Sequence, residues 1–121
     1  MPRRLLFPAL PLAALLLAGC HRTPAAADPQ PFFDACGRAI KASDPREALR
    51  HAEAALQLAA TPEQRSLANT CVAEALLALH RFREAALTFD LALADDTTNS
   101  TARQGKVRVI EQWQFHDRVP R

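Results

Sequence analysis

A short sequence pattern occurs twice in this chain, 37 residues apart, and it constrains the fold more than any other feature. Arg46-Glu47-Ala48 recurs as Arg83-Glu84-Ala85, and Ala55-Leu56 recurs as Ala92-Leu93. In each copy, residues that are mostly small lie along one face of the predicted helix. They are Ala48, Ala52 and Ala55 in the first copy and Ala85, Phe89 and Ala92 in the second. Such a stripe lets two helix axes approach closely. A repeat of this length in a helix-rich chain predicts stacked helical hairpins.

The residues after position 31 favour helix almost throughout, and no segment alternates apolar and polar residues as a strand does. Asp44-Pro45-Arg46-Glu47 and Thr61-Pro62-Glu63-Gln64 both have the layout of a capped helix start with proline at the first helical position. Asn99 or Ser100 can cap a last helix. These signals predict five helices, at residues 31–42, 45–59, 62–79, 82–94 and 100–116.

The second copy of the pattern resembles a tetratricopeptide repeat (TPR). Residues 82–93, Phe-Arg-Glu-Ala-Ala-Leu-Thr-Phe-Asp-Leu-Ala-Leu, resemble the second helix of such a repeat in their aromatic opening, their small residues and the aromatic Phe89. Residues 62–79 would be its first helix, and residues 29–58 resemble a weaker repeat in which Phe32 replaces the usual tryptophan. The chain departs from the pattern at Asn69, where a large aromatic residue is usual, and at Thr97, where proline usually closes the repeat.

The TPR resemblance implies an all-α fold, a short right-handed α-solenoid of two helical hairpins with a C-terminal capping helix. In that cap Val107, Ile110 and Trp113 form an apolar stripe, and we expect Trp113 to pack in the core rather than serve as an exposed anchor. The resemblance also implies a concave face, lined by the first helix of each repeat, that binds peptides or helices. By position, this partner-binding groove would present Phe33, Gly37, Thr70, Glu74 and Arg108; each could equally be ordinary helix surface.

The N-terminus has the layout of an export signal: Pro2-Arg3-Arg4, then the apolar run Leu5 to Ala18. This run has 14 residues, whereas a membrane-spanning helix needs about 20. Leu17-Ala18-Gly19-Cys20 resembles the lipobox of bacterial lipoproteins, which implies cleavage before Cys20 and lipid on its thiol. An ordinary secretory signal cut near Ala25-Ala26-Ala27 is the alternative. By the sorting rule of enteric lipoproteins, His21 after the cysteine implies the outer membrane, facing the periplasm.

These features divide the chain into four parts. Residues 1–19 are the predicted signal peptide, and residues 20–31 the lipidated cysteine with a tether rich in proline and alanine. Residues 32–117 form the predicted helical domain, followed by a tail at 118–121. Cysteine usage agrees with export, because assigning Cys20 to lipid leaves two thiols, Cys36 and Cys71. They could form a disulfide or remain two buried thiols.

The charge of the chain argues against nucleic acid as a partner. Without Arg3 and Arg4, 13 basic residues stand against 13 acidic ones. The sequence also gives little support for catalysis or metal binding. The four histidines are scattered, no Cys-x-x-Cys or His-Glu-x-x-His motif occurs, and no serine lies in a nucleophile elbow. Two pairs at i, i+4 spacing, Glu47 with His51 and His80 with Glu84, are expected to be surface ion pairs. We therefore predict no enzyme activity, no metal, no small-molecule substrate and no cofactor other than the lipid on Cys20.

The remaining function is binding. The leading hypothesis is an outer-membrane-anchored, periplasmic TPR-like lipoprotein that serves as a protein interaction module in envelope assembly, similar to TPR lipoproteins that assist pilus secretins or β-barrel insertion. The alternative is a small lipid-anchored inhibitor or immunity protein of a periplasmic enzyme. Such a protein would need a protruding anchor, for which Phe115 and Trp113 are the candidates.

Overall fold

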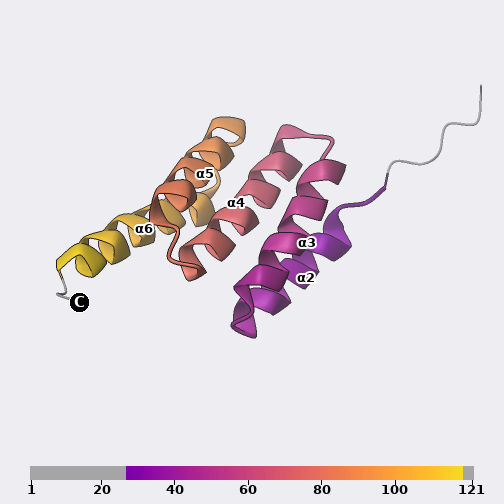
Figure 1. Ribbon diagram of the computed structural model, residues 1–121. Helices are drawn as coiled ribbons and strands as arrows, with labels where there is room; N and C mark the ends of the chain where they lie inside the picture. The colour runs from indigo at the N-terminus through magenta and orange to yellow at the C-terminus, as the bar shows by residue number, and fades with distance from the viewer. Residues whose placement is uncertain (1–26, 119–121) are drawn as a thin grey trace, which may run out of the picture.

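The computed structural model describes residues 27–118, and within this range the chain forms helices and no strand. The helices are α2 (Gln30–Lys41), α3 (Pro45–Leu58), α4 (Pro62–Ala78), α5 (Phe82–Asp95) and α6 (Ser100–Arg118), shown in Figure 1. The prediction of an all-helical fold is confirmed. The predicted signal peptide, Cys20, the predicted tether up to residue 26 and residues 119–121 lie outside the described residues.

Two helices extend beyond the residues predicted for the helical domain. Helix α2 begins at Gln30, inside the segment predicted as tether, because Pro29 and Pro31 suit the start of a helix, where the first N–H groups have no helical partner. Helix α6 continues to Arg118, one residue into the predicted tail. The other helix ends differ from the prediction by one residue each.

The 37-residue repeat of the sequence is also a repeat of structure. Helices α3 and α5 begin and end 37 residues apart. The turns that precede them match bond for bond, since Asp44 N donates to Ala39 O and Arg81 N donates to Leu76 O, both at 2.9 Å. In each turn a residue other than glycine takes the left-handed conformation: Ser43 at φ 58° and His80 at φ 59°. The turn and second helix of the α2–α3 hairpin therefore recur in the α4–α5 hairpin, whereas their first helices differ: α2 has 12 residues and α4 has 17.

The predicted helix starts are present, with one difference. Thr61 and Gln64 form a complete capping box, in which each side chain accepts a hydrogen bond from the other residue's backbone N–H. At Asp44 only half of the box forms, because the Glu47 carboxylate is held by the guanidinium of Arg50 instead. Neither of the expected Glu–His ion pairs forms; Glu84, like Glu47, pairs with an arginine three residues away.

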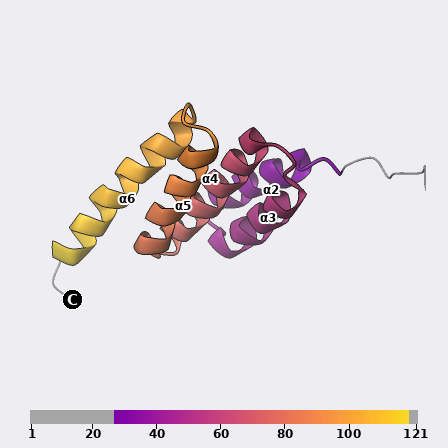
Figure 2. The ribbon, with the colours of Figure 1, turned by 90° about the horizontal axis from the view of Figure 1, so that it is seen from above.

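The helices follow one another across the molecule, with α2 and α3 at one end, α4 in the middle, and α5 and α6 at the other end (Figures 1 and 2). The main core lies where α4, α5 and α6 meet, and Phe89 is its largest fully buried side chain. A smaller cluster around Cys36 and Ala52 holds α2 and α3 against α4.

The packing of α6 differs from the prediction. Ala102, Gly105 and Val109 are buried, whereas Val107 and Ile110 are 52% and 45% exposed. The Gly105 backbone lies so close to the Phe89 ring that a side chain there would overlap it, and this close approach sets which face of α6 turns inward. Trp113, expected in the core, is instead 38% exposed and stacks on Phe82 at the edge of the helices, with ring centroids 6.4 Å apart. None of the described helices has the length and apolar character needed to cross a membrane.

Candidate protein-binding groove

Helices α2, α4 and α6 line a hollow of about 290 Å³ on the surface of the molecule. Its lining residues are Gly37, Ile40, Lys41, Leu67, Thr70, Cys71, Glu74 and Thr101. Three of the five predicted groove residues, Gly37, Thr70 and Glu74, therefore come together here. Arg108 joins them through an ion pair with Glu74, while Phe33, one turn before Gly37 on α2, is not part of the lining.

The wall of the hollow at α2 is open. A Cβ atom added at Gly37 would meet nothing within 4 Å, so this position leaves room for a side chain of another molecule. On α4, Leu67 is 51% exposed and adds an apolar side chain to the lining. The hollow thus offers apolar surface without a covering side chain.

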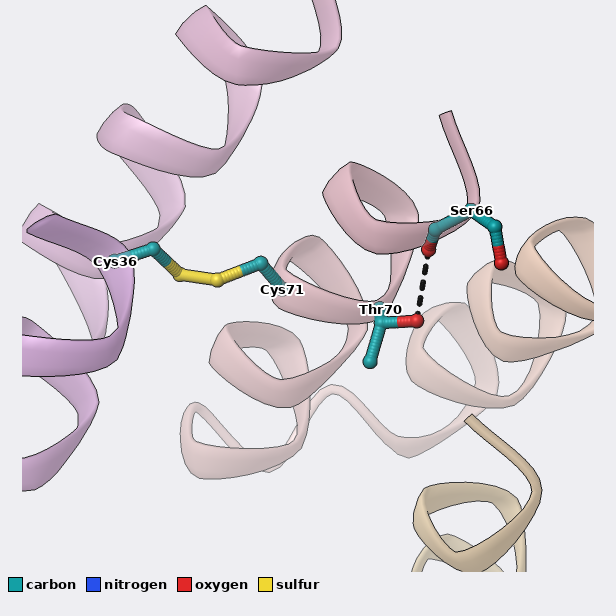
Figure 3. Close-up of a disulfide and its surroundings, with 4 residues drawn as sticks. All are labelled: Cys36, Ser66, Thr70 and Cys71. Atoms are coloured by element: carbon teal, nitrogen blue, oxygen red, sulfur yellow. Dashed lines mark hydrogen bonds between the residues drawn. A yellow bond between two sulfur atoms is a disulfide. The ribbon is translucent and has the colours of Figure 1, made fainter. Parts of the chain in front are cut away.

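A disulfide crosses beneath this surface. Cys36 on α2 and Cys71 on α4 are joined in the structure, with their Cα atoms 6.6 Å apart (Figure 3). Cys36 is fully buried and Cys71 is partly exposed on the lining of the hollow. Of the two alternatives for the thiols, the structure has the bridged one, and the bridge fixes the first hairpin to the second.

A buried hydrogen-bond network supports the other side of the hollow. The Asn99 side-chain amide donates to Ser66 Oγ at 2.9 Å and to Thr70 Oγ1 at 3.0 Å. Ser66 Oγ donates to the Ala92 carbonyl at 2.7 Å, and Thr70 Oγ1 donates to the Ser66 carbonyl at 2.8 Å, a bond visible in Figure 3. The network ties α4 to the end of α5 and to the start of α6.

This network was not predicted from the sequence. The sequence offers either Asn99 or Ser100 as the cap of the last helix, and Asn99 Oδ1 accepts the Ala102 N–H at 3.0 Å, but spacing along the chain does not reveal where the Asn99 amide points. The Thr70 hydroxyl is hydrogen-bonded within the protein, to Asn99 and to the Ser66 carbonyl, and Thr70 is buried. Thr70 therefore shapes the hollow rather than offering its hydroxyl to a partner.

The ionic contact at the edge of the hollow joins α4 to α6. Arg108 Nη2 lies 2.6 Å from Glu74 Oε1, and the Glu74 side chain is the more buried of the two. Lys41, on the opposite wall, has no ion pair among residues 27–118. The charge left for a partner in this hollow is therefore positive.

A second, larger hollow of about 560 Å³ lies between the α4–α5 turn and the C-terminal half of α6. It is lined by His80, Phe82, Glu111, Gln112, Phe115 and His116, and its surface is mainly apolar. The rings of His80 and His116 lie 6.2 Å apart, centroid to centroid. Phe115, at 70% exposed, projects from the rim.

The resolved pKa shifts lie outside both hollows. The hydrogen bond from Arg50 lowers the pKa of Glu47 and raises that of Arg50, and the hydrogen bonds from Thr98 lower the pKa of Asp96. Within the described part of the chain no three histidine, cysteine, aspartate or glutamate side chains are grouped so as to hold a metal ion. Shape and apolar exposure are the properties that distinguish the groove.

No protein-family model matches this chain, and comparisons with curated proteins and with solved structures likewise find no match.

Proposed function

We propose that this protein is a lipid-anchored interaction module of the bacterial outer membrane, facing the periplasm, and that it binds a protein of the cell envelope. Its helical hairpins would form a short TPR-like solenoid with α6 as the cap. The groove between α2, α4 and α6 would be the binding surface, and the partner would belong to an assembly of the pilus, secretion or barrel-insertion type.

The observation that carries this proposal is the meeting of Gly37, Thr70 and Glu74 in one hollow. Gly37 and Thr70 lie more than 30 positions apart in the sequence, and the TPR resemblance alone predicts that both belong to one groove with Glu74. Their common hollow, open at Gly37 and apolar at Leu67, is what a groove for a peptide or helix requires.

The Cys36–Cys71 bridge supports the proposed periplasmic location, because structural disulfides persist in oxidising compartments such as the periplasm. The proposed lipid anchor would strengthen binding of the groove to its partner. A hollow of this size gives modest binding on its own, and tethering to the membrane of the partner raises the effective concentration.

The test uses the full-length protein in the envelope of a bacterial host. A photo-crosslinking amino acid at position 37 is expected to capture one defined envelope protein, whereas the same amino acid at position 53, exposed on α3, is not. Gly37→Trp should fill the hollow and reduce recovery of that partner by about tenfold or more, while Glu53→Trp should leave it unchanged. Equal capture at both positions would contradict the groove.

The alternative, an inhibitor or immunity protein of a periplasmic enzyme, has one observation in its favour. Phe115 projects into solvent beside the larger hollow, as an anchor for an enzyme cleft would. Recovery of a single hydrolase that is lost in Phe115→Ala and kept in Gly37→Trp would favour the alternative over the groove.

A further inference from the structure

Helix α6 carries apolar side chains on two faces, and one of them is uncovered. Ala102, Gly105 and Val109 turn inward, while Val107 and Ile110 turn outward. Toward its C-terminal end the axis of α6 diverges from that of α5, as Figure 2 shows; the rings of Trp113 and His116 still contact Phe82, but every residue from Ile110 to Arg118 is exposed. A surface helix normally has one apolar face and one polar face. The outward face of α6 therefore has the composition of a contact surface.

The charges on this face are arranged symmetrically about Ile110. Arg103 lies seven residues before Ile110 and Asp117 lies seven residues after it, so all three share one face, two turns apart. Neither Arg103 nor Asp117 forms an ion pair within residues 27–118. The neighbouring Lys106 is already held by Asp90 on α5. The outward face thus has an apolar centre with a positive charge at one end and a negative charge at the other.

We infer that a second copy of this chain docks on α6, antiparallel, with a twofold axis passing beside Ile110. In that arrangement two residues face each other when their numbers add up to 220. Ile110 meets Ile110 of the second copy, and Val107 meets the exposed side of Trp113, whose ring also stacks on Phe82 of its own chain. Arg103 meets Asp117 at each end, which gives two ion pairs.

The charge pattern selects both the occupant and its direction. A parallel pair would place Arg103 beside Arg103 and Asp117 beside Asp117, and like charges facing each other are unfavourable. The antiparallel pair brings no like charges together on this face, since Lys106 faces the uncharged Gln114. A face whose two halves complement each other about one residue is what an isologous contact between identical chains requires. An unrelated partner would need no such symmetry.

The first test measures self-association of the full-length chain by sedimentation over a range of concentrations. A concentration-dependent dimer is expected. Ile110→Glu should weaken it by about 100-fold, because both copies lose a buried apolar contact and two carboxylates meet on the axis. Leu67→Glu is the matched control: Leu67 is exposed to a similar degree but lies in the groove on α4, so this variant should dimerise like the parent. A monomer at all concentrations, or equal loss in both variants, would overturn the inference.

The second test fixes the register. Arg103→Glu and Asp117→Arg should each weaken the dimer by about tenfold, and the double variant, in which the charges are exchanged, should recover it. In a Cys20→Ala background, Ile110→Cys should yield a disulfide-linked dimer under oxidising conditions, while Cys20→Ala alone and Leu67→Cys in the same background should not. A double variant that stays as weak as either single variant would rule out this antiparallel register.

Discussion

At the scale of single residues, two glycines inside helices illustrate how the surroundings decide what a residue contributes. A glycine inside a helix lowers stability by about 1 kcal/mol relative to alanine. Gly37 has open space where a Cβ would lie, so Gly37→Ala should raise the free energy of unfolding by about that amount. At Gly105 a Cβ would overlap the Phe89 ring, which is fully buried and has no room to move. Gly105→Ala should therefore lower stability by about 1–2 kcal/mol.

Urea unfolding followed by circular dichroism measures both changes, and each variant is the control for the other because the chemical change is the same. Stabilisation by both substitutions would mean that α6 can shift away from α5 without loss. Gly105 would then not determine which face of α6 is buried.

Asp96 offers a test of the loop that leads into α6. Its carboxylate accepts the Thr98 hydroxyl at 2.6 Å and the Thr98 backbone N–H at 2.9 Å, and these bonds lower the pKa of Asp96, the hydroxyl bond having the larger effect. A lowered pKa means that the stabilisation is present above the ordinary pKa of aspartate and is lost as the pH falls through the lowered value. Thr98→Val should raise the pKa of Asp96 toward its ordinary value, as an NMR titration would show. No change in that titration would exclude the hydroxyl bond.

At the scale of the elements, helix starts could be predicted because their determinants are local. Pro45 and Pro62 each follow a capping residue, and both helices begin there. The orientation of α6 could not be predicted in the same way. Its sequence contains two apolar faces, and only the approach of Gly105 to Phe89 on another helix decides between them. The Asn99 network was missed for the same reason, because it joins residues about 30 positions apart.

Asn99 makes that network testable. Asn99→Asp keeps an oxygen that can cap the Ala102 N–H, but it removes the amide that donates to Ser66 and Thr70. Both hydroxyls already donate their protons to backbone carbonyls, so a carboxylate would face two oxygens with no donor. We expect Asn99→Asp to lower stability by about 1–3 kcal/mol. If urea unfolding shows no loss, the cap alone accounts for the role of Asn99.

The Cys36–Cys71 disulfide joins hairpins that are otherwise held by helix packing. The bridge closes a loop across 35 positions, which corresponds to a stabilisation of about 4 kcal/mol in the chain-entropy model. The double variant Cys36→Ala, Cys71→Ala should lose a comparable amount, and hydrogen exchange in α2 should rise most. Reductant should destabilise the parent and leave the double variant unaffected. A fully reduced parent, verified by mass, with an unchanged unfolding midpoint would contradict this assignment.

At the scale of the whole molecule, the three proposed roles, anchoring, partner binding and self-association, fall at different places along its length. Helix α2, which follows the predicted tether, lies at one end, the groove spans α2 to α6, and the uncovered face of α6 lies at the far end (Figure 1). A second copy docked on α6 would leave both grooves open. Two grooves and two anchors in one assembly would give bivalent binding at the membrane without enlarging either hollow.

The proposed membrane location depends on lipid attached to Cys20, and this can be tested by removing the thiol. Cys20→Ala removes the thiol that the lipobox would modify, so the protein should no longer sediment with membranes. Binding of the purified variant to its partner should be unchanged, because the proposed groove is formed by α2, α4 and α6, and Cys20 precedes α2 by ten residues in the sequence. Crosslinking from position 37 in cells should nevertheless fall, since the advantage in effective concentration is lost. A Cys20→Ala protein that still sediments with membranes and captures its partner at full yield would show that lipid on Cys20 has no part in the mechanism.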